Sequence, residues 1–323
     1  MNEIKTINIG DKEYPKRLLK INNPPKKLYV RGDYKLLNSD SIAIVGARKC
    51  SEYGMEQSYK FAYELSTQRM CIVSGLAVGI DKFAHLGAYK NEGKTIAVLG
   101  CGINKMYPKE NLELSEEILK NGGCIISECD INEDANLKKF PKRNRIITGI
   151  AMGTLVVEAG SNRSGILVTA RLSHEQEKPV FCIPGDLGRS TSLGTNLLIK
   201  NYGIFTTRVE DIFNELNIEY DSEKLEKNRI TSKKKYKYIK ECYNEQKNTH
   251  NKKNTEKSKV PECKKIVSKE YAPVYKVLEN VPLSINEIYL KSGISIKEVN
   301  QILTMLELEG FVKQEPGNRF SLV

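Results

Sequence analysis

Residues 41–54 read SIAIVGARKCSEYG, and this stretch decides the fold of the chain. A mostly apolar run ends at a glycine and is followed by two cations and a serine, as where a buried strand turns into a helix. Similar runs, rich in Val and Ile and spaced by helix-sized segments, follow at residues 70–75, 95–102, 124–128, 154–160 and 179–185. Such runs are typical of buried parallel strands with crossover helices. The sequence predicts an α/β fold with an extended Rossmann-like, doubly wound parallel sheet over residues 41–220.

The turns after the predicted strands carry the residues that suit an anion. Sheets of this kind bind ligands beyond the carboxyl ends of their strands, where helix N-termini present backbone N–H groups. Gly46, Arg48 and Ser51 follow the first strand, and Gly75 and Gly79 follow the second. A further turn after the fifth strand contains Ser164 and Gly165. The sequence therefore predicts that several phosphate-binding turns share one edge of the sheet.

The densest group of cations is KKFPKRNR at residues 138–145. Pro141 favours a helix start, and cations there oppose the helix dipole unless an anion is also present. A solvated charged face is the alternative interpretation. Because Phe140 could stack on a base, phosphate and nucleic-acid binding is the preferred hypothesis. The predicted ligands from this segment are Lys138, Lys139, Phe140, Lys142, Arg143, Asn144 and Arg145.

Nucleotide cofactors and metals have little support in the sequence. Gly93-Lys94-Thr95 lacks the first glycine of a P-loop and precedes a strand, and Gly100-x-Gly102 lacks the third glycine of a dinucleotide fingerprint. None of the eight cysteines forms a CxxC pair, and the three histidines lie far apart. We therefore expect no cofactor, no metal site, and cysteines that fill the core.

Charge is distributed unevenly along the 323 residues. Residues 221–270 hold 16 Lys and Arg against 8 Asp and Glu, whereas residues 271–323 hold 5 against 6. The basic stretch has few apolar residues, so it is predicted to be a disordered linker. Residues 1–40 are interpreted as an N-terminal extension. The longest apolar run, residues 95–103, is too short to span a bilayer, and the start lacks a secretion signal. A cytoplasmic protein without membrane contact is expected.

The last segment, residues 271–323, shows the pattern of a small winged helix. Helices are predicted over residues 274–278, from a capping box at Ser284, and over 295–308, with a wing at 310–312 and 319–321. Residues 295–310, which contain the third helix, hold one Lys and three Glu. This helix is therefore poorly suited to bind the phosphates that flank a DNA groove. We expect this domain to bind a protein or modulate assembly, with its core formed by Val299, Ile302, Leu303, Leu306 and Phe311.

Taken together, these segments resemble the DNA-processing protein A family, DprA or Smf. The matching motifs are Tyr14-Pro15, Leu28-Tyr29-Val30-Arg31-Gly32-Asp33, Val45-Gly46-Ala47-Arg48, Ser74-Gly75-Leu76-Ala77-Val78-Gly79-Ile80-Asp81, Phe140-Pro141-Lys142-Arg143-Asn144-Arg145-Ile146-Ile147, Val157-Glu158-Ala159, Ser164-Gly165 and Gly194-Thr195-Asn196. The resemblance covers residues 14–215 and 271–323. FPxRNRII together with SGxAxGID is highly specific.

The resemblance implies a non-enzymatic protein that binds single-stranded DNA and protects incoming strands during natural transformation and recombination. It also implies that the protein loads the recombinase RecA onto DNA coated with single-strand-binding protein and forms a homodimer through the Rossmann-like domain. Carried over by motif, Arg48 and the cations of residues 138–145 would line the DNA pocket. The family usually has Ser where this chain has Ala47, which removes one hydroxyl contact.

Two other functions compete with this one. Nucleoside monophosphate phosphoribohydrolases use a Gly-Gly-x-Gly-Thr-x-x-Glu turn, but here the spacing from Gly153 to Glu158 is one residue too long. A winged-helix transcription regulator is the second rival.

The preferred function makes two predictions. If about four phosphates are neutralised, a plot of log affinity against log salt concentration should have a slope near −3. Replacing Arg48 or Arg143 by Ala should weaken binding without unfolding the domain.

Overall fold

The computed structural model describes residues 3–91, 93–136, 139–160, 165–256, 271–278, 282–308, 311–315 and 319–322. The chain divides into two compact units, Met1–Gln246 and Lys247–Val323. Each unit has its own hydrophobic core. The boundaries predicted from the sequence, after residues 220 and 270, fall on either side of this division.

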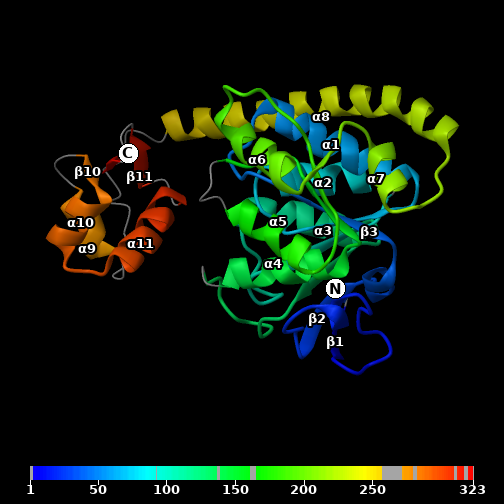
Figure 1. The fold of residues 1–323 in the computed structure, drawn as a ribbon, viewed down its shortest axis with the longest axis horizontal. Coiled ribbons are helices and arrows are strands. Elements are labelled where there is room, and N and C mark those ends of the chain that lie inside the picture. Colours follow the sequence, from blue (N-terminus) through cyan, green and yellow to red (C-terminus); the bar gives the residue numbers. More distant parts are fainter. Residues whose placement is uncertain are drawn as a thin grey trace. The chain divides into compact units, whose positions relative to one another are not determined.

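The first unit is built on a nine-stranded sheet of order β1-β2-β6-β5-β4-β3-β7-β8-β9 (Figure 1). From β6 to β9 in this order, the seven strands pair parallel with one another. All six predicted strands are present: β3 (Ser41–Val45), β4 (Cys71–Ser74), β5 (Thr95–Leu99), β6 (Cys124–Ser127), β7 (Gly153–Val156) and β8 (Val180–Cys182). Along the chain, β4, β5 and β6 are added on one side of β3, and β7, β8 and β9 are added on its other side. The predicted doubly wound topology is therefore confirmed.

Helices cover both faces of the sheet. One face carries α1 (Glu52–Thr67), α2 (Ile80–Tyr89), α3 (Leu112–Lys120) and α7 (Val209–Glu215), and the other carries α4 (Lys139–Ile150), α5 (Gly165–Glu175) and α6 (Leu193–Asn201). In β3, Ile42 and Ile44 pack toward α1, whereas Ala43 and Val45 pack toward α4. Because both strand faces are buried, the strands read as continuous apolar runs. Short 3-10 helices lie in the connections at Leu18–Lys20, Tyr34–Asn38, Lys109–Asn111 and Ser190–Ser192.

The N-terminal residues are part of the sheet, so the prediction of a separate extension over residues 1–40 is wrong. β1 (Ile4–Asn8) pairs antiparallel with β2 (Lys27–Gly32), which pairs antiparallel with β6. Leu28 and Val30 of β2 lie in the core, and the Tyr14 hydroxyl donates a 2.6 Å hydrogen bond to the Pro25 carbonyl. In β2, Lys27 and Arg31 border only three apolar residues, so the strand lacks the longer apolar run that marked the other strands.

The basic stretch after residue 220 begins as a helix, so the predicted disordered linker is wrong for its first part. After the short β9 (Ile204–Phe205), α8 (Ser222–Glu256) runs along the outer side of α1, α2 and α7 (Figure 1). Leu225, Ser232 and Tyr236 are buried at helical spacing. Because these few residues anchor a mostly polar helix, composition alone indicated disorder. Residues 257–270 lie outside the described residues.

The second unit has the predicted winged-helix elements. They are α9 (Ala272–Val277), α10 (Ile285–Ser292), α11 (Ile296–Leu308), β10 (Leu283–Ser284), β11 (Val312–Glu315) and β12 (Arg319–Leu322), with strand order β10-β12-β11. Ser284 and Glu287 form the predicted capping box. The predicted apolar stripe is confirmed, since Val299, Leu303 and Leu306 are buried.

The described residues contain neither a membrane-spanning helix nor a cluster of metal ligands. In the part of the chain that the structure covers, no helix is both long and apolar enough to cross a membrane. The same residues contain no group of three or more His, Cys, Asp and Glu side chains placed to hold a metal ion.

Candidate nucleic-acid interface

The turns after β3 and β4 pack tightly against each other. Gly79 has a φ of 80°, and a Cβ there would overlap the carbonyl oxygens of Ala47 and Arg48. A Cβ at Gly46 would overlap Ile80, and the Ile80 N–H donates to the Ala47 carbonyl at 3.2 Å. The sequence analysis interpreted these glycines as room for a ligand. In the structure, they let one turn of the backbone approach the other.

The N-terminus of α1 already holds an anion, and it belongs to the protein. The Ser51 N–H donates to a carboxylate oxygen of Glu158 at 2.8 Å, and the Ser51 hydroxyl donates to the other oxygen. Thr191 adds a hydroxyl hydrogen bond of 3.0 Å to Glu158, which is only 1% exposed. A carboxylate at this end of a helix is favoured by the helix dipole. Ser51 therefore caps α1 and binds Glu158, contrary to the expectation that it faces a phosphate.

The turn after β4 is satisfied internally as well. Buried Asp81 accepts hydrogen bonds from the N–H groups of Gly75, at 3.0 Å, and Ala77, at 3.4 Å. Burial raises the pKa of Asp81. Because this carboxyl group occupies the N–H donors, Gly75 does not offer its amide to a ligand, as the sequence analysis expected.

Arg143 lies inside the domain and ties two strand ends together. Its guanidinium donates to the carbonyl oxygens of Gly75, at 2.8 Å, and Val98, and only 5% of the residue is exposed. Burial lowers the pKa of Arg143 to about 10, so the group stays charged near neutral pH. A Cβ at Gly75 would overlap the guanidinium, so this glycine makes room for Arg143. The position was predicted, but the structure gives the side chain a different role, which is to link β4 and β5.

Most other cations of this segment are paired within the protein. Arg145 is buried and contacts Glu128 at 2.5 Å, and Lys139 pairs with Glu133. Lys142 has an exposed side chain that lies 4.0 Å from Glu128. Among its described residues, 139–145, the segment therefore presents one exposed lysine rather than a run of free cations.

Of four further predicted ligands, two lie among the described residues. The half-buried side chain of Asn144 donates to the Thr169 hydroxyl at 2.8 Å. Gly165 is exposed and opens α5, and a Cβ there would meet no atom. Lys138 and Ser164 lie outside the described residues.

At this edge of the sheet, exposed Arg48 and Tyr107 contact half-buried Phe140, and we call these three residues the Arg48 platform. The Arg48 guanidinium carbon lies 5.7 Å from the centroid of the Phe140 ring, whose centroid is 5.5 Å from that of Tyr107. Phe140 fits there because Gly100 has no Cβ to meet its ring. The platform joins the loops after β3 and β5 to the first turn of α4 (Figure 1).

The platform combines charge with surfaces for stacking. Arg48 and Lys49 are exposed, and no carboxylate among the described residues lies within ion-pair distance of either. Tyr107 is 42% exposed. A ring and a guanidinium plane can each stack on a nucleobase, while the cation attracts phosphate. The sequence analysis missed Tyr107, although its place in the loop after β5, on the same edge as Arg48, was an available signal.

Comparisons with known proteins agree with this fold. Residues 5–217 match the family model for DNA recombination-mediator protein A, and residues 261–318 match the model for the DprA winged helix domain. The chain belongs to the DNA recombination-mediator protein A family. This confirms the family resemblance of the sequence motifs.

Relatives in this family show how far the similarity extends. Protein Smf of Escherichia coli K12 is 42% identical over 203 residues, which are 63% of this chain and 54% of that protein. DNA processing protein DprA of Bacillus subtilis 168 is 38% identical over 67% of this chain and 74% of its own length. The chain thus spans about half of the Escherichia coli relative.

Two solved structures have the same fold. DNA processing protein A of Streptococcus pneumoniae has a TM-score of 0.62 and 37% identity, over 68% of this chain and 76% of that one. The protein of the same name from Helicobacter pylori has a TM-score of 0.59 and 30% identity, over 67% of this chain and 98% of that one. The Helicobacter structure concerns the single-stranded DNA binding mode of that protein.

Proposed function

We propose that this chain is a non-catalytic recombination mediator that binds single-stranded DNA at the Arg48 platform. The observation that carries the proposal is the exposed guanidinium of Arg48 beside the rings of Phe140 and Tyr107. Bases in a duplex are stacked and paired, whereas bases of a single strand are free to stack on such rings. Family membership and the Helicobacter relative, which binds single strands, support the same ligand.

The platform favours binding with little sequence preference. Its groups are a cation and two ring faces, and stacking is tolerant because every base has a π-face. A protein reads the sequence of DNA through hydrogen bonds to the edges of the bases. The groups of the platform are poorly placed to make such bonds. The expected ligand is therefore any single strand.

The partners and the cellular role follow from the family. The proposed role is to protect incoming strands in natural transformation and to load RecA onto DNA coated with single-strand-binding protein. A homodimer of the Rossmann-like domain, working in the cytoplasm, is part of the proposal. A binding role also fits Glu158, whose carboxylate is buried and held by Ser51 and Thr191, away from any substrate.

For the winged-helix domain we propose a protein partner. The exposed residues of α11 include Glu298 and Thr304, and the apolar stripe is used in the core. With 5 Lys and Arg against 6 Asp and Glu in residues 271–323, duplex DNA gains no net attraction to this domain. Binding of the isolated segment to random duplex at low salt, at micromolar affinity or tighter, would instead favour a transcription regulator.

The test of the proposed function is a titration of the full chain against a labelled single-stranded oligonucleotide and its matched duplex. The expected result is at least tenfold tighter binding of the single strand. Equal affinities for the two would reject the proposal. Release of a free base from nucleoside monophosphates would favour the enzyme alternative.

A further inference from the structure

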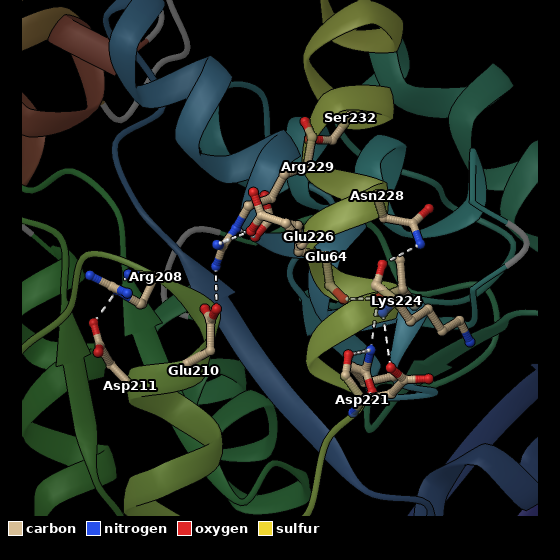
Figure 2. Close-up of polar contacts among 12 residues, drawn as sticks. Glu64, Arg208, Glu210, Asp211, Asp221, Lys224, Glu226, Asn228, Arg229 and Ser232 are labelled. Carbon is tan, nitrogen blue, oxygen red and sulfur yellow. Dashed lines mark hydrogen bonds and ion pairs between the residues drawn. The ribbon is translucent and has the colours of Figure 1, made fainter.

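A network of charges anchors α8 to the Rossmann-like domain. The Arg229 guanidinium contacts Glu210 of α7, Glu226 at 2.7 Å and Glu64 of α1 at 3.7 Å. Figure 2 shows the Arg229 side chain directed away from α8 toward Glu210. Such a network holds a helix in one orientation, which a flexible tether would not allow.

Apolar contacts fix the same helix further along. The Tyr236 ring lies 5.7 Å from that of Tyr59 and 6.5 Å from that of Phe83, measured between centroids. Leu225 is completely buried. Positions 225, 229, 232 and 236 recur at intervals of four, three and four residues, so they form one face of α8. This face is docked on the domain over about 16 Å of helix.

The opposite face of α8 carries several lysines between Glu223 and Glu241, two exposed carboxylates that lie at its ends. Lys227, Lys234 and Lys237 recur at intervals of seven and three residues, which places them together, and all three are exposed. Lys224 and Lys233 are exposed beside them. Among the residues that the structure describes, none of the side-chain ammonium groups of these five lysines lies within 4.0 Å of a carboxylate oxygen, in contrast to the Arg229 guanidinium.

We propose that the outward lysines of α8 form a second phosphate-binding surface for the DNA backbone. The span from Lys227 to Lys237 is about 15 Å along the helix, and docking presents its charges in a fixed row. Unpaired cations held in a row suit a regular polyanion, because the phosphates of the ligand supply their counter-charge. Binding then releases the ions that were condensed on the DNA. The proposal goes beyond the Arg48 platform, since it requires no base stacking and predicts equal contributions to single-stranded and duplex binding.

The test compares two full-length variants with the unmodified protein in binding to single-stranded and duplex DNA. The first variant carries Lys227→Gln, Lys234→Gln and Lys237→Gln. The matched control carries Lys12→Gln, Lys16→Gln and Lys26→Gln, which removes the same charge from exposed lysines near the N-terminus. Melting curves of both variants establish that each one folds.

The expected result is specific to α8. Loss of three phosphate contacts makes the log-log salt slope for single strands less negative by about 2. The ratio of unmodified to variant affinity then shrinks about 20-fold between 50 and 200 mM salt. The control should change the slope by far less. An unchanged slope in the α8 variant, or an equal change in the control, would overturn the proposal.

Two further measurements distinguish this proposal from binding at the Arg48 platform and from binding to a membrane. If Arg48→Ala weakens binding while the α8 variant behaves as the unmodified protein, the platform stands and the α8 surface is rejected. If the unmodified protein binds neither DNA, both proposals fail. Loss of binding to vesicles that contain phosphatidylserine, with DNA binding intact, would mean that these lysines face a membrane and would reject the DNA surface.

Discussion

The guanidinium of Arg143 donates a 2.8 Å hydrogen bond to the carbonyl oxygen of Gly75. This contact, with a second one to the Val98 carbonyl, places the most central cation of the FPKRNR segment inside the domain. Arg48, in contrast, is exposed at the edge of the sheet, above Phe140. Arg48 and Arg143, two of the arginines in the family motifs, therefore have different roles, and mutation can separate them.

Arg48→Ala should weaken single-strand binding without affecting the fold. A lost charge-assisted hydrogen bond to phosphate corresponds to about 1.5 to 3 kcal/mol, or about 10- to 100-fold in affinity. Fluorescence anisotropy measures the affinity, and Arg48→Lys should restore part of it because the charge is kept. Unchanged binding by Arg48→Ala would remove the platform from the proposed function.

Arg143→Ala should destabilise the domain. It removes the guanidinium donor from the carbonyl oxygens of Gly75 and Val98, and it removes the cation that acts most strongly on buried Asp81. Losses of this kind lower the free energy of unfolding by about 3 kcal/mol. Urea unfolding followed by circular dichroism checks the prediction. A variant of normal stability that no longer binds DNA would instead return Arg143 to the binding site.

Tyr107→Ala should weaken single-strand binding by about 1 to 3 kcal/mol, while Tyr107→Phe should change it little, because stacking needs the ring and not the hydroxyl. Duplex binding is the internal control and should be the same in all three proteins. Equal loss in both variants would indicate that the hydroxyl, rather than the ring, is used.

Stability should depend on pH through Glu64, which lies beside Arg229 under α8. Burial raises the pKa of Glu64 from 4.5 to about 7, so the folded state binds more protons than the unfolded state between these values. The unmodified protein should therefore lose stability as pH rises from about 4.5 to 7. In Glu64→Gln this loss should be smaller, as thermal melts at pH 5 and pH 8 can measure. Parallel pH profiles of the two proteins would contradict the assignment.

The six predicted parallel strands were predictable because each is buried on both faces and has a glycine at or near one end. β1 and β2 were not, since each has at most three consecutive apolar residues, bordered by polar or charged ones, on an antiparallel edge. α8 escaped prediction for a related reason. Its docking depends on few residues, chiefly Leu225, Arg229 and Tyr236, among many lysines.

The candidate site was predictable in position but not in detail. Motifs placed Arg48 and Phe140 at the correct edge of the sheet. They could not show that Glu158 occupies the N-terminus of α1 or that Arg143 turns inward, because both depend on contacts between residues distant in sequence. Tyr107 was missed because its role depends on contact with Phe140.

The most direct test of the central claim maps where a single strand contacts the protein. An oligonucleotide that contains 5-iodouracil is crosslinked to the full chain by light, and the modified residues are found by mass spectrometry. The account predicts adducts on Tyr107 or Phe140, which Arg48→Ala should reduce. Adducts confined to residues 271–323, with the Tyr107 and Phe140 peptides unmodified, would contradict it.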